Sequence, residues 1–244
     1  MNINEIAKLA GVSRATVSRY LNQGYVSEEK KKIIRKVIEE TGYQPSSQAQ
    51  MLRTKKTKLV GVILPKIDSN TISREVAGIS DILTKQGYQL ILANTNNSTE
   101  EELKYLSLFR DNQVDGVIFI ATILTKQHKD MLKEYRVPIV LLGQHLEGYP
   151  CIYQDDYKAA MSLTEELVKS GKKFGYITVT DKDEAVGRKR LSGVEEVLKK
   201  NRIELNSDCV KCGSFTLESG YEKTEELFNE YPDIDTLICA TDTM

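Results

Sequence analysis

From residue 59 onward the chain alternates between short apolar runs and longer amphipathic segments, and this alternation restricts its fold more than any other feature. The run over 59–64, LVGVIL, is apolar throughout, as expected of a parallel strand that is covered on both faces. Further strands are predicted at 88–93, 116–121, 137–142, 174–179 and 236–240. Because helical patterns lie between these runs, we predict an α/β fold in which helices cover both faces of parallel sheets.

Acidic residues open the helix that is predicted after the second strand. The sequence Thr99-Glu-Glu-Glu has the form of a capping box, so this helix is expected to begin with Thr99 as its cap. The glutamates at 100–102, like Glu225 and Glu226, are most simply interpreted as parts of solvated helix faces.

The first 58 residues differ in charge from the rest of the chain. They hold 12 Lys and Arg against 5 Asp and Glu, whereas the remaining 186 residues hold 22 against 30. A basic module on an acidic body indicates a polyanionic partner for the first segment alone. This distribution is expected of a nucleic-acid-binding domain.

The sequence shows neither a membrane-spanning run nor an export signal. No stretch approaches the ~18 consecutive apolar residues that a transmembrane helix needs, and the charged N-terminus has no apolar secretory core. Four scattered cysteines fit a reducing compartment. We therefore expect a cytoplasmic protein without a membrane partner.

Two short helices are predicted within the basic segment. Asn4 is the candidate N-cap of the first helix, Gly11 interrupts it, and Ser13 is the candidate N-cap of a second helix over 14–22. Two such helices joined by a tight turn form a helix-turn-helix, whose second helix lies in the major groove of DNA.

Polar side chains on the second helix are the candidate DNA contacts. The outward side chains, which suit base edges and phosphates, are those of Arg14, Thr16, Ser18 and Arg19. A third helix is predicted between Ser27 and Gly42, with an apolar stripe of Ile33, Ile34, Val37 and Ile38. The alternative is a small three-helix bundle whose charges are merely solvated.

Familiar catalytic and metal-binding motifs are missing from the sequence. No two glycines are two residues apart, so there is no Gly-x-Gly phosphate loop, and no Walker loop, G-x-S-x-G elbow or H-E-x-x-H motif occurs. Cys209 and Cys212 have redox or half-zinc spacing but no second pair, so we interpret them as ordinary strand cysteines. The sequence predicts a protein that is not an enzyme and uses no cofactor or metal.

Polar side chains follow the predicted strands at the points where they end. In strand order these residues are Lys66, Asp68, Ser69, Asn94, Thr122 and Gln144. Because the carboxyl ends of parallel strands share one edge of a sheet, these groups are expected to converge on a cleft. Amides, hydroxyls and a few charges suit a polyhydroxylated ligand such as a sugar.

The N-terminal segment carries the pattern IA-x-x-AGVS-x-x-TVSR-x-x-N over 6–22, then Val26-Ser27 and Gly42-Tyr43-x-Pro45. This pattern resembles the headpiece of the lactose-repressor (LacI) family. The resemblance implies a homodimer that binds double-stranded operator DNA, one headpiece on each half-site. The DNA-contacting positions that it implies are Asn4, Ser13, Arg14, Ala15, Thr16, Ser18, Arg19, Asn22, Tyr25, Leu52 and Arg53.

The segment 46–53 resembles the hinge of that family, which becomes helical on operator DNA. Leu52 matches a hinge leucine that opens a minor-groove base step and so kinks the duplex. Judged from the residues alone, Leu52 could equally be a buried linker side chain. Residues 54–58 form a basic linker where the charge changes sign, which marks a domain boundary.

The rest of the chain resembles the core of the same family, which is shaped like a periplasmic sugar-binding protein with two α/β lobes around an effector cleft. Recognisable stretches are 114–118, Gln154-Asp155-Asp156, Gly187-Arg188-x-Arg190-x-x-Gly193 and 240–242. Arg190 matches an arginine that holds the effector, although a surface ion pair is the alternative interpretation. The implied effector-binding positions are Lys66, Asp68, Ser69, Asn94, Thr122, Gln144, Asp155, Arg188, Arg190, Thr241 and Asp242.

Within the family, the stretches around Lys66, Asp155 and Arg190 are most similar to trehalose repressors. Lys66 stands where such a repressor has arginine, so the positive charge is retained and the bidentate fork is lost. Placing both Lys66 and Arg190 around a neutral ligand would leave the desolvation of two cations uncompensated. We therefore predict a sugar phosphate, with trehalose 6-phosphate as the first candidate and with Asp68 and Gln144 holding hydroxyls.

These observations divide the chain into a helix-turn-helix headpiece at 1–45, a hinge helix and linker at 46–58, and core lobes at 59–155 and 156–244. The chain stops at Met244, where the family has further strands and helices, so the two-lobed core is expected to be incomplete. The predicted function is repression of carbohydrate-utilisation genes under the control of a sugar or sugar phosphate. The alternative is a sugar-binding or sugar-converting protein with an accessory basic N-terminus.

Overall fold

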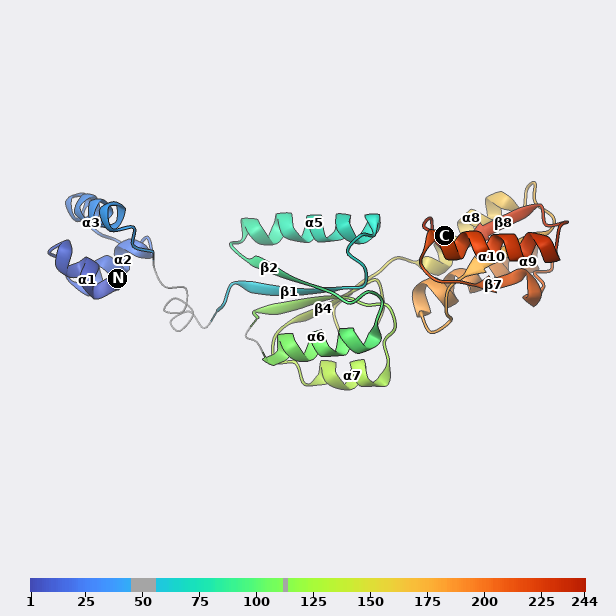
Figure 1. Cartoon of the computed structure of the whole chain (residues 1–244), viewed down its shortest axis with the longest axis horizontal. Helices are drawn as coiled ribbons and strands as arrows, with labels where there is room; N and C mark the ends of the chain where they lie inside the picture. Colours follow the sequence, from blue (N-terminus) through green and yellow to red (C-terminus); the bar gives the residue numbers. More distant parts are fainter. Residues whose placement is uncertain (45–55, 112–113) are drawn as a thin grey trace. The chain divides into compact units, whose positions relative to one another are not determined.

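The computed structural model describes residues 1–44, 56–111 and 114–244. The chain divides into two compact units, Met1–Thr57 and Lys58–Met244 (Figure 1). The predicted hinge over 46–53, with Leu52 and Arg53, lies outside the described residues, as does Pro45. No helix in the described part of the chain is long and apolar enough to cross a membrane.

The described part of the N-terminal unit holds three helices: α1 over Ile3–Leu9, α2 over Arg14–Leu21 and α3 over Glu28–Thr41. Their common core consists of Ile6, Ala7, Ala10, Val17, Val26 and Ile34. The turn between α1 and α2 passes through Gly11, whose φ of 59° lies in the left-handed region that glycine adopts at little cost. The predicted helix-turn-helix is therefore present.

Two details of the predicted headpiece were wrong. The N-cap of α1 is Asn2 rather than Asn4, because the Asn2 side chain accepts hydrogen bonds from the backbone N–H groups of Asn4 (2.9 Å) and Glu5 (3.2 Å). Ile33 is 42% exposed and does not belong to the buried stripe of α3. Successive helical residues are about 100° apart, so burying Ile34 turns Ile33 toward solvent.

Five parallel strands form the first sheet of the second unit, in the order β2-β1-β3-β4-β5. They are β1 (Leu59–Leu64), β2 (Gln89–Asn94), β3 (Gly116–Ile120), β4 (Ile139–Leu142) and β5 (Cys151–Ile152). The buried run of β1 lies inside the sheet, between β2 and β3, as its continuous apolar sequence predicts. A Cβ atom on Gly61 would lie 2.5 Å from the Phe109 ring, so glycine is what allows α6 to approach β1 this closely.

Helices cover both faces of this sheet (Figure 1). On one face, α5 (Asn70–Lys85) packs Ile72, Val76 and Ile79 against Val62 and Leu64. On the other face lie α6 (Thr99–Asp111) and α7 (Lys126–Lys133), and the larger apolar core of this part of the unit fills the space between them and the sheet. This arrangement confirms the predicted α/β class.

A second parallel sheet follows, in the order β7-β6-β8. Its strands are β6 (Phe174–Thr178), β7 (Val210–Cys212) and β8 (Thr236–Cys239), and its helices are α8 (Asp156–Leu167), η1 (Glu184–Lys189), α9 (Arg190–Lys200), η2 (Ser207–Cys209) and α10 (Leu217–Glu230). Helices α8 and α9 contribute to the core on one face, and α10 contributes Leu227 to the core on the other. Both sheets are therefore sandwiched between helices.

Three further predictions about this unit were wrong, one of them only in part. Helix α6 begins at Thr99, and the preceding Ser98 is the residue whose Oγ accepts from the N–H of Glu101 (3.3 Å). Glu102 is fully buried rather than solvated, because α6 turns it toward α7. The short strand β5 was not predicted. The interpretation of Cys209 and Cys212 as strand cysteines is confirmed for Cys212, which ends β7, and was wrong for Cys209, which ends η2.

Candidate functional site

The start of α2 presents the predicted DNA-contacting side chains. Ser13 caps the helix by accepting from the N–H of Thr16 (3.2 Å), and its hydroxyl lies 2.9 Å from the Thr16 hydroxyl. Arg14, Ala15 and Arg19 are exposed. A rigid, capped helix therefore carries two cations on a surface that also offers hydroxyls, which is the combination that base edges and phosphates require.

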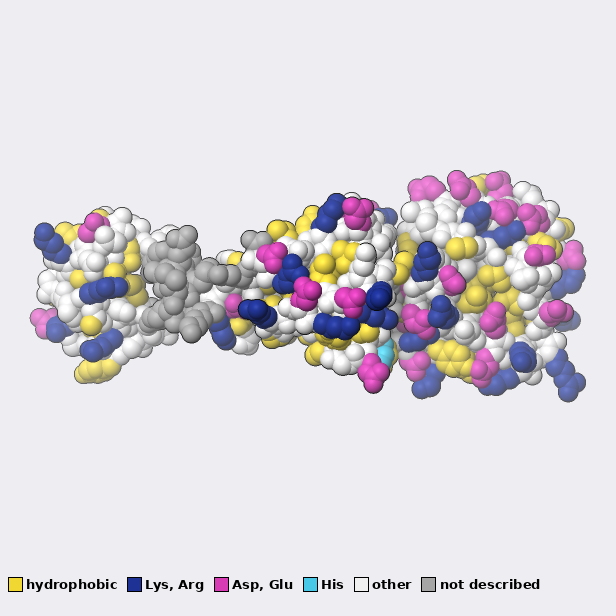
Figure 2. Space-filling model, turned by 90° about the horizontal axis from the view of Figure 1, so that it is seen from below, with side chains coloured by type: hydrophobic (Ala, Val, Ile, Leu, Met, Phe, Trp, Pro, Cys, Tyr) yellow, Lys and Arg dark blue, Asp and Glu magenta, His cyan; other side chains and the backbone are white. Residues whose placement is uncertain are grey.

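Other predicted DNA contacts flank α2. The Asn22 side chain donates to the Ser18 carbonyl at the C-terminal end of the helix (2.5 Å), so it stabilises that end. Tyr25 follows, with 92% of its surface exposed, and Asn4 is exposed on α1. Lys and Arg side chains outnumber Asp and Glu on the visible face of this unit (Figure 2).

Residues after β1 form the first part of the candidate effector site. Lys66 Nζ lies 3.8 Å from Asp68 Oδ2, and the Lys66 side chain is 35% exposed. Ser69 is the N-cap of α5 and accepts from the N–H of Ile72 (3.5 Å). Lys66 and Asp68 thus remain accessible to a ligand, whereas the Ser69 hydroxyl already serves the helix.

Residues after β2 and β3 lie at the same edge of the sheet, because these strands flank β1 in parallel. Asn94 Oδ1 accepts from the N–H of Ile67 (3.2 Å), and its amide donates to Asn96 (2.8 Å). Thr122, after β3, donates its hydroxyl proton to Glu102 (3.1 Å). The first three strand ends are thus brought together, as their parallel order predicts.

The predicted effector residue after β4 has a partner within the protein. Gln144 is buried, and its amide donates to the Asp183 carboxylate (2.8 Å). Asp183 is also buried and accepts from the N–H groups of Ala185 (3.1 Å) and Val186 (3.0 Å) at the start of η1. Burial raises the pKa of Asp183, and the hydrogen bonds from Val186, Gln144 and Ala185 oppose this shift only in part.

This shift predicts a pH-dependent contribution of Asp183 to stability. Because its pKa is raised in the folded state, protonation of Asp183 stabilises the fold fully below its ordinary pKa of 3.8, and this stabilisation is lost as pH rises through the raised value. Asp183→Asn should therefore lose less unfolding free energy than the unmodified chain over that pH range. Urea unfolding from pH 3.5 upward measures the difference, with the exposed Asp181→Asn as control. Equal pH slopes in the unmodified chain and Asp183→Asn would contradict it.

Arg190 lies at the start of α9 between two partners. Its Nε and Nη2 atoms each lie 2.7 Å from Asp156 Oδ1, and its Nη1 donates to the carbonyl of Ala240 at the end of β8 (2.6 Å). Asp156 is only 5% exposed and the Arg190 side chain is 28% exposed. Arg190 is thus in an ion pair, but with a buried carboxylate at the start of α8 rather than with a surface residue.

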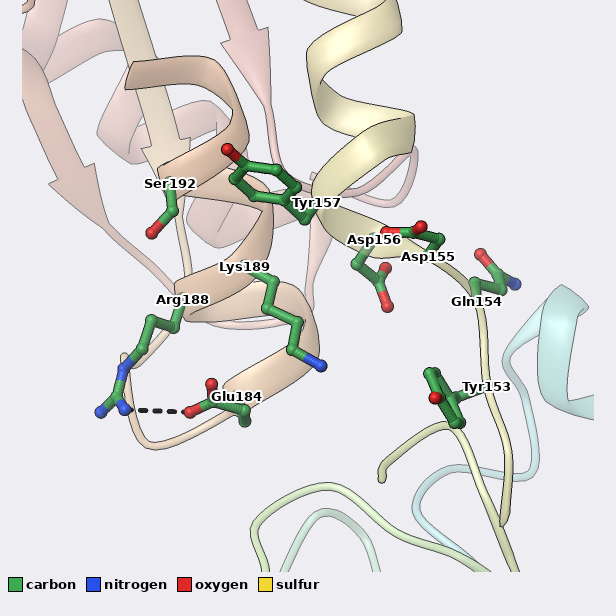
Figure 3. Close-up of a pocket in the computed structure, with 9 residues that line it drawn as sticks. All are labelled: Tyr153, Gln154, Asp155, Asp156, Tyr157, Glu184, Arg188, Lys189 and Ser192. Atoms are coloured by element: carbon green, nitrogen blue, oxygen red, sulfur yellow. Dashed lines mark ion pairs between the residues drawn. The ribbon is translucent and has the colours of Figure 1, made fainter. Parts of the chain in front are cut away.

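A cavity of about 330 Å³ opens beside α8 and η1 (Figure 3). It is lined by Tyr153, Gln154, Asp155, Asp156, Tyr157, Glu184, Arg188, Lys189 and Ser192. The predicted effector residues Asp155 and Arg188 line it, but Arg188 is paired with Glu184 (2.9 Å) and Asp155 with Lys158 (3.0 Å). Lys189 extends toward Tyr153, with Nζ 5.7 Å from the ring centroid.

The last predicted effector residues follow β8. Thr241 is half-buried, and its hydroxyl oxygen has no hydrogen-bond partner among the described residues. Asp242 is exposed. The described residues contain no group of three or more His, Cys, Asp and Glu side chains that could hold a metal ion.

The interior pair of Glu102 and His128 was missed in the sequence. Both side chains are buried, and His128 Nε2 lies 3.1 Å from Glu102 Oε2. A usable signal was present, since Thr125 and His128 have the spacing of a capping box and do form one at the start of α7. The pairing with Glu102 had no signal, because these residues are 26 positions apart.

Two family descriptions match the chain. Residues 2–46 match "Bacterial regulatory proteins, lacI family", and residues 57–244 match "Periplasmic binding proteins and sugar binding domain of LacI family". Together they cover the headpiece and both sheets.

Individual relatives agree with these matches. The chain is 33% identical over 244 residues to the sucrose operon repressor of Staphylococcus xylosus, covering 100% of this chain and 75% of that protein. The lac repressor dimer bound to operator and the anti-inducer ONPF is similar with a TM-score of 0.87 and 22% identity, over 100% of this chain and 74% of that one. The trehalose repressor from Escherichia coli has a TM-score of 0.67 and 22% identity, over 76% and 69%. These two structures support the fold alone.

Proposed function

The chain belongs to the lacI family of bacterial regulatory proteins, and we infer that it is a sequence-specific DNA-binding repressor of carbohydrate-utilisation genes. The observation that carries this inference is the presence, in one chain, of a regulatory headpiece and a sugar-binding core of the same family. As a member of this family the chain is a regulator and not an enzyme. The sucrose operon repressor, a 33% identical relative, is named for a sugar operon.

The DNA partner is a near-palindromic operator bound by a cytoplasmic homodimer, with 1–45 as the headpiece and 46–58 as hinge and linker. The exposed cations on α2 and the exposed Tyr25 support this assignment. Leu52 opens a base step in the proposed complex. The effector acts by preferring one DNA-binding state, and it can release the operator only as far as that preference extends.

The effector is a disaccharide or its phosphate, held between core lobes at 59–155 and 156–244. Lys66 is the cation that supports a phosphate, because its nearest carboxylate is 3.8 Å away and its side chain is partly exposed. Arg190 contributes less free charge, since Asp156 already neutralises it. Trehalose 6-phosphate and sucrose 6-phosphate are the first candidates, with Asp68 and Gln144 as proposed hydroxyl contacts.

The function is tested by gel shift with the full chain on genomic fragments. We expect a discrete complex on few fragments that survives competitor DNA, and its release by one sugar or sugar phosphate. Binding of all fragments alike, or of none, contradicts the assignment. In that case a sugar-binding or sugar-converting protein becomes the better interpretation.

Lys66→Met is expected to lower the affinity for a phosphorylated disaccharide by about tenfold or more, which corresponds to roughly 1.4 kcal/mol of binding free energy. The physical reason is the loss of a charge-assisted hydrogen bond to the phosphate, while the hydroxyl contacts remain. Calorimetry with trehalose, sucrose and their 6-phosphates measures the effect. Lys85→Met, which removes an exposed lysine paired with Asp81 on α5, is the matched control. Equal weakening of free and phosphorylated sugars would show that Lys66 does not contact the phosphate.

A further inference from the structure

A carboxylate lies in the apolar interior between α6 and α7, directly behind the end of β3. Glu102 and His128 are both 0% exposed. Glu102 Oε2 and His128 Nε2 lie 3.1 Å apart, and neither atom has a hydrogen-bond partner in the described part of the structure. Burying a carboxylate costs free energy unless hydrogen-bond donors contact its oxygens. The side chains around Glu102 therefore matter for their donors and acceptors as well as for packing.

The contacts of the other ring nitrogen determine where His128 carries its proton. The backbone N–H of Thr125 points at His128 Nδ1 (3.3 Å), and the Thr125 hydroxyl lies 2.7 Å from the same atom. A backbone N–H can only donate, so Nδ1 accepts and the ring proton resides on Nε2, facing Glu102. The ring is also stacked on Phe119, with centroids 5.9 Å apart.

The second oxygen of Glu102 determines the orientation of the Thr122 hydroxyl. Thr122 Oγ1 donates to Glu102 Oε1 at 3.1 Å. A hydroxyl has one proton, and here that proton points inward to the carboxylate. The outward side of Thr122 Oγ1 therefore offers only lone pairs.

We propose that Glu102 and His128 are positioning residues that hold Thr122 as a hydrogen-bond acceptor at the effector site. At this strand end the site selects a sugar hydroxyl, which can donate, and rejects a phosphate, which at neutral pH mainly accepts. A phosphate on the effector then lies at the Lys66 end of the site. This inference rests on the proposed function, because it takes Thr122 to contact the effector.

The variant Glu102→Gln should reverse the polarity of Thr122. Since the Nε2 proton of His128 needs an acceptor, the new amide turns its oxygen to His128 and its NH2 group to Thr122. The amide then donates to Thr122 Oγ1, and the hydroxyl proton points outward. Because Thr122 meets a hydroxyl of the sugar in both ligands, we expect the affinities for the free and the phosphorylated disaccharide to fall together, by about tenfold.

Calorimetry with the full chain tests this using sucrose, trehalose and their 6-phosphates as probes. Glu100→Gln, which changes an exposed glutamate on the same helix, should leave both affinities unchanged. Thr122→Val should lower the affinity for the free sugar and Thr122→Ser should restore it. In the Thr122→Val background, Glu102→Gln should no longer lower either affinity, because there is no hydroxyl to turn. A loss of the same size from Glu102→Gln in the Thr122→Val background would reveal a merely structural role and overturn the proposal.

A measurement without ligand separates this inference from the proposed function. Nitrogen-15 NMR of the His128 ring should show the proton on Nε2 in the unmodified chain, and a proton on Nδ1 overturns the network. If no disaccharide binds while His128 has the expected tautomer, the effector class is wrong and the ligand part of this inference fails with it. If the sugars bind and the tautomer is wrong, the proposed function stands and this inference alone fails.

Discussion

Replacing Arg14 with alanine should cost about 1 to 3 kcal/mol of binding free energy at the cognate operator and relax the base preference at one position of each half-site. The reason is geometric, since Arg14 is the first residue of α2 and is exposed. In a helix-turn-helix, the N-terminal residues of the second helix reach base edges in the major groove. Binding to a randomised operator library, read by sequencing, measures both effects.

Arg19 supplies the contrast, because it is exposed in the last turn of the same helix. We expect Arg19→Ala to lower the affinities for cognate and random DNA by similar factors. The slope of the logarithm of the binding constant against the logarithm of salt concentration should decrease in magnitude by about one, as expected when one phosphate contact is lost. Fluorescence titration over a range of salt concentrations separates the two variants. The assignment fails if both variants lose base discrimination to the same extent.

Removing the carboxylate of Asp156 should destabilise the second unit by about 3 kcal/mol, the lower end of the range for breaking a buried ion pair. Asp156 is buried, and its Oδ1 atom meets two nitrogens of Arg190 at 2.7 Å. Asp156→Ala leaves this guanidinium without a carboxylate against it. The lower end applies because Arg190 is partly exposed, so water compensates some of the loss.

Urea unfolding of the full chain, followed by circular dichroism, measures this effect. The matched control is Glu184→Ala in the same cavity wall, whose pair with Arg188 is exposed on both sides and should contribute less than about 1 kcal/mol. The double variant Asp156→Ala with Arg190→Met should recover much of the loss, because no charge is then left unpaired. Similar losses for Asp156→Ala and Glu184→Ala would show that the buried pair contributes no more than a surface one.

Much of the fold was predicted from patterns within short stretches of the sequence. The continuous apolar run of β1 indicated a doubly covered strand, and the polar residues after β1, β2 and β3 indicated where those strand ends would meet. Both inferences rely on the period of the backbone and on the parallel order of strands, which neighbouring residues specify. The headpiece motif was likewise short and local.

Errors arose where a residue's surroundings come from distant parts of the chain. Glu102 looked like its exposed neighbour Glu100, and only the packing of α6 against α7 brings it to His128. Arg190 was predicted to hold the effector, with a surface ion pair as the alternative, and only the arrangement of α8, α9 and β8 brings Asp156 and Ala240 to it. No local pattern records such pairings.

The sequence by itself determined the fold class, the helix-turn-helix and its charge, and the family, because these depend on periodicity, composition and a contiguous motif. The tertiary structure decided which polar groups are buried and what each one contacts. Gln144 meets Asp183, and Thr122 turns its proton to Glu102. The physical reason is that a buried polar group must satisfy its hydrogen bonds with whatever donors and acceptors the folded chain places nearby, however far apart they lie in the sequence.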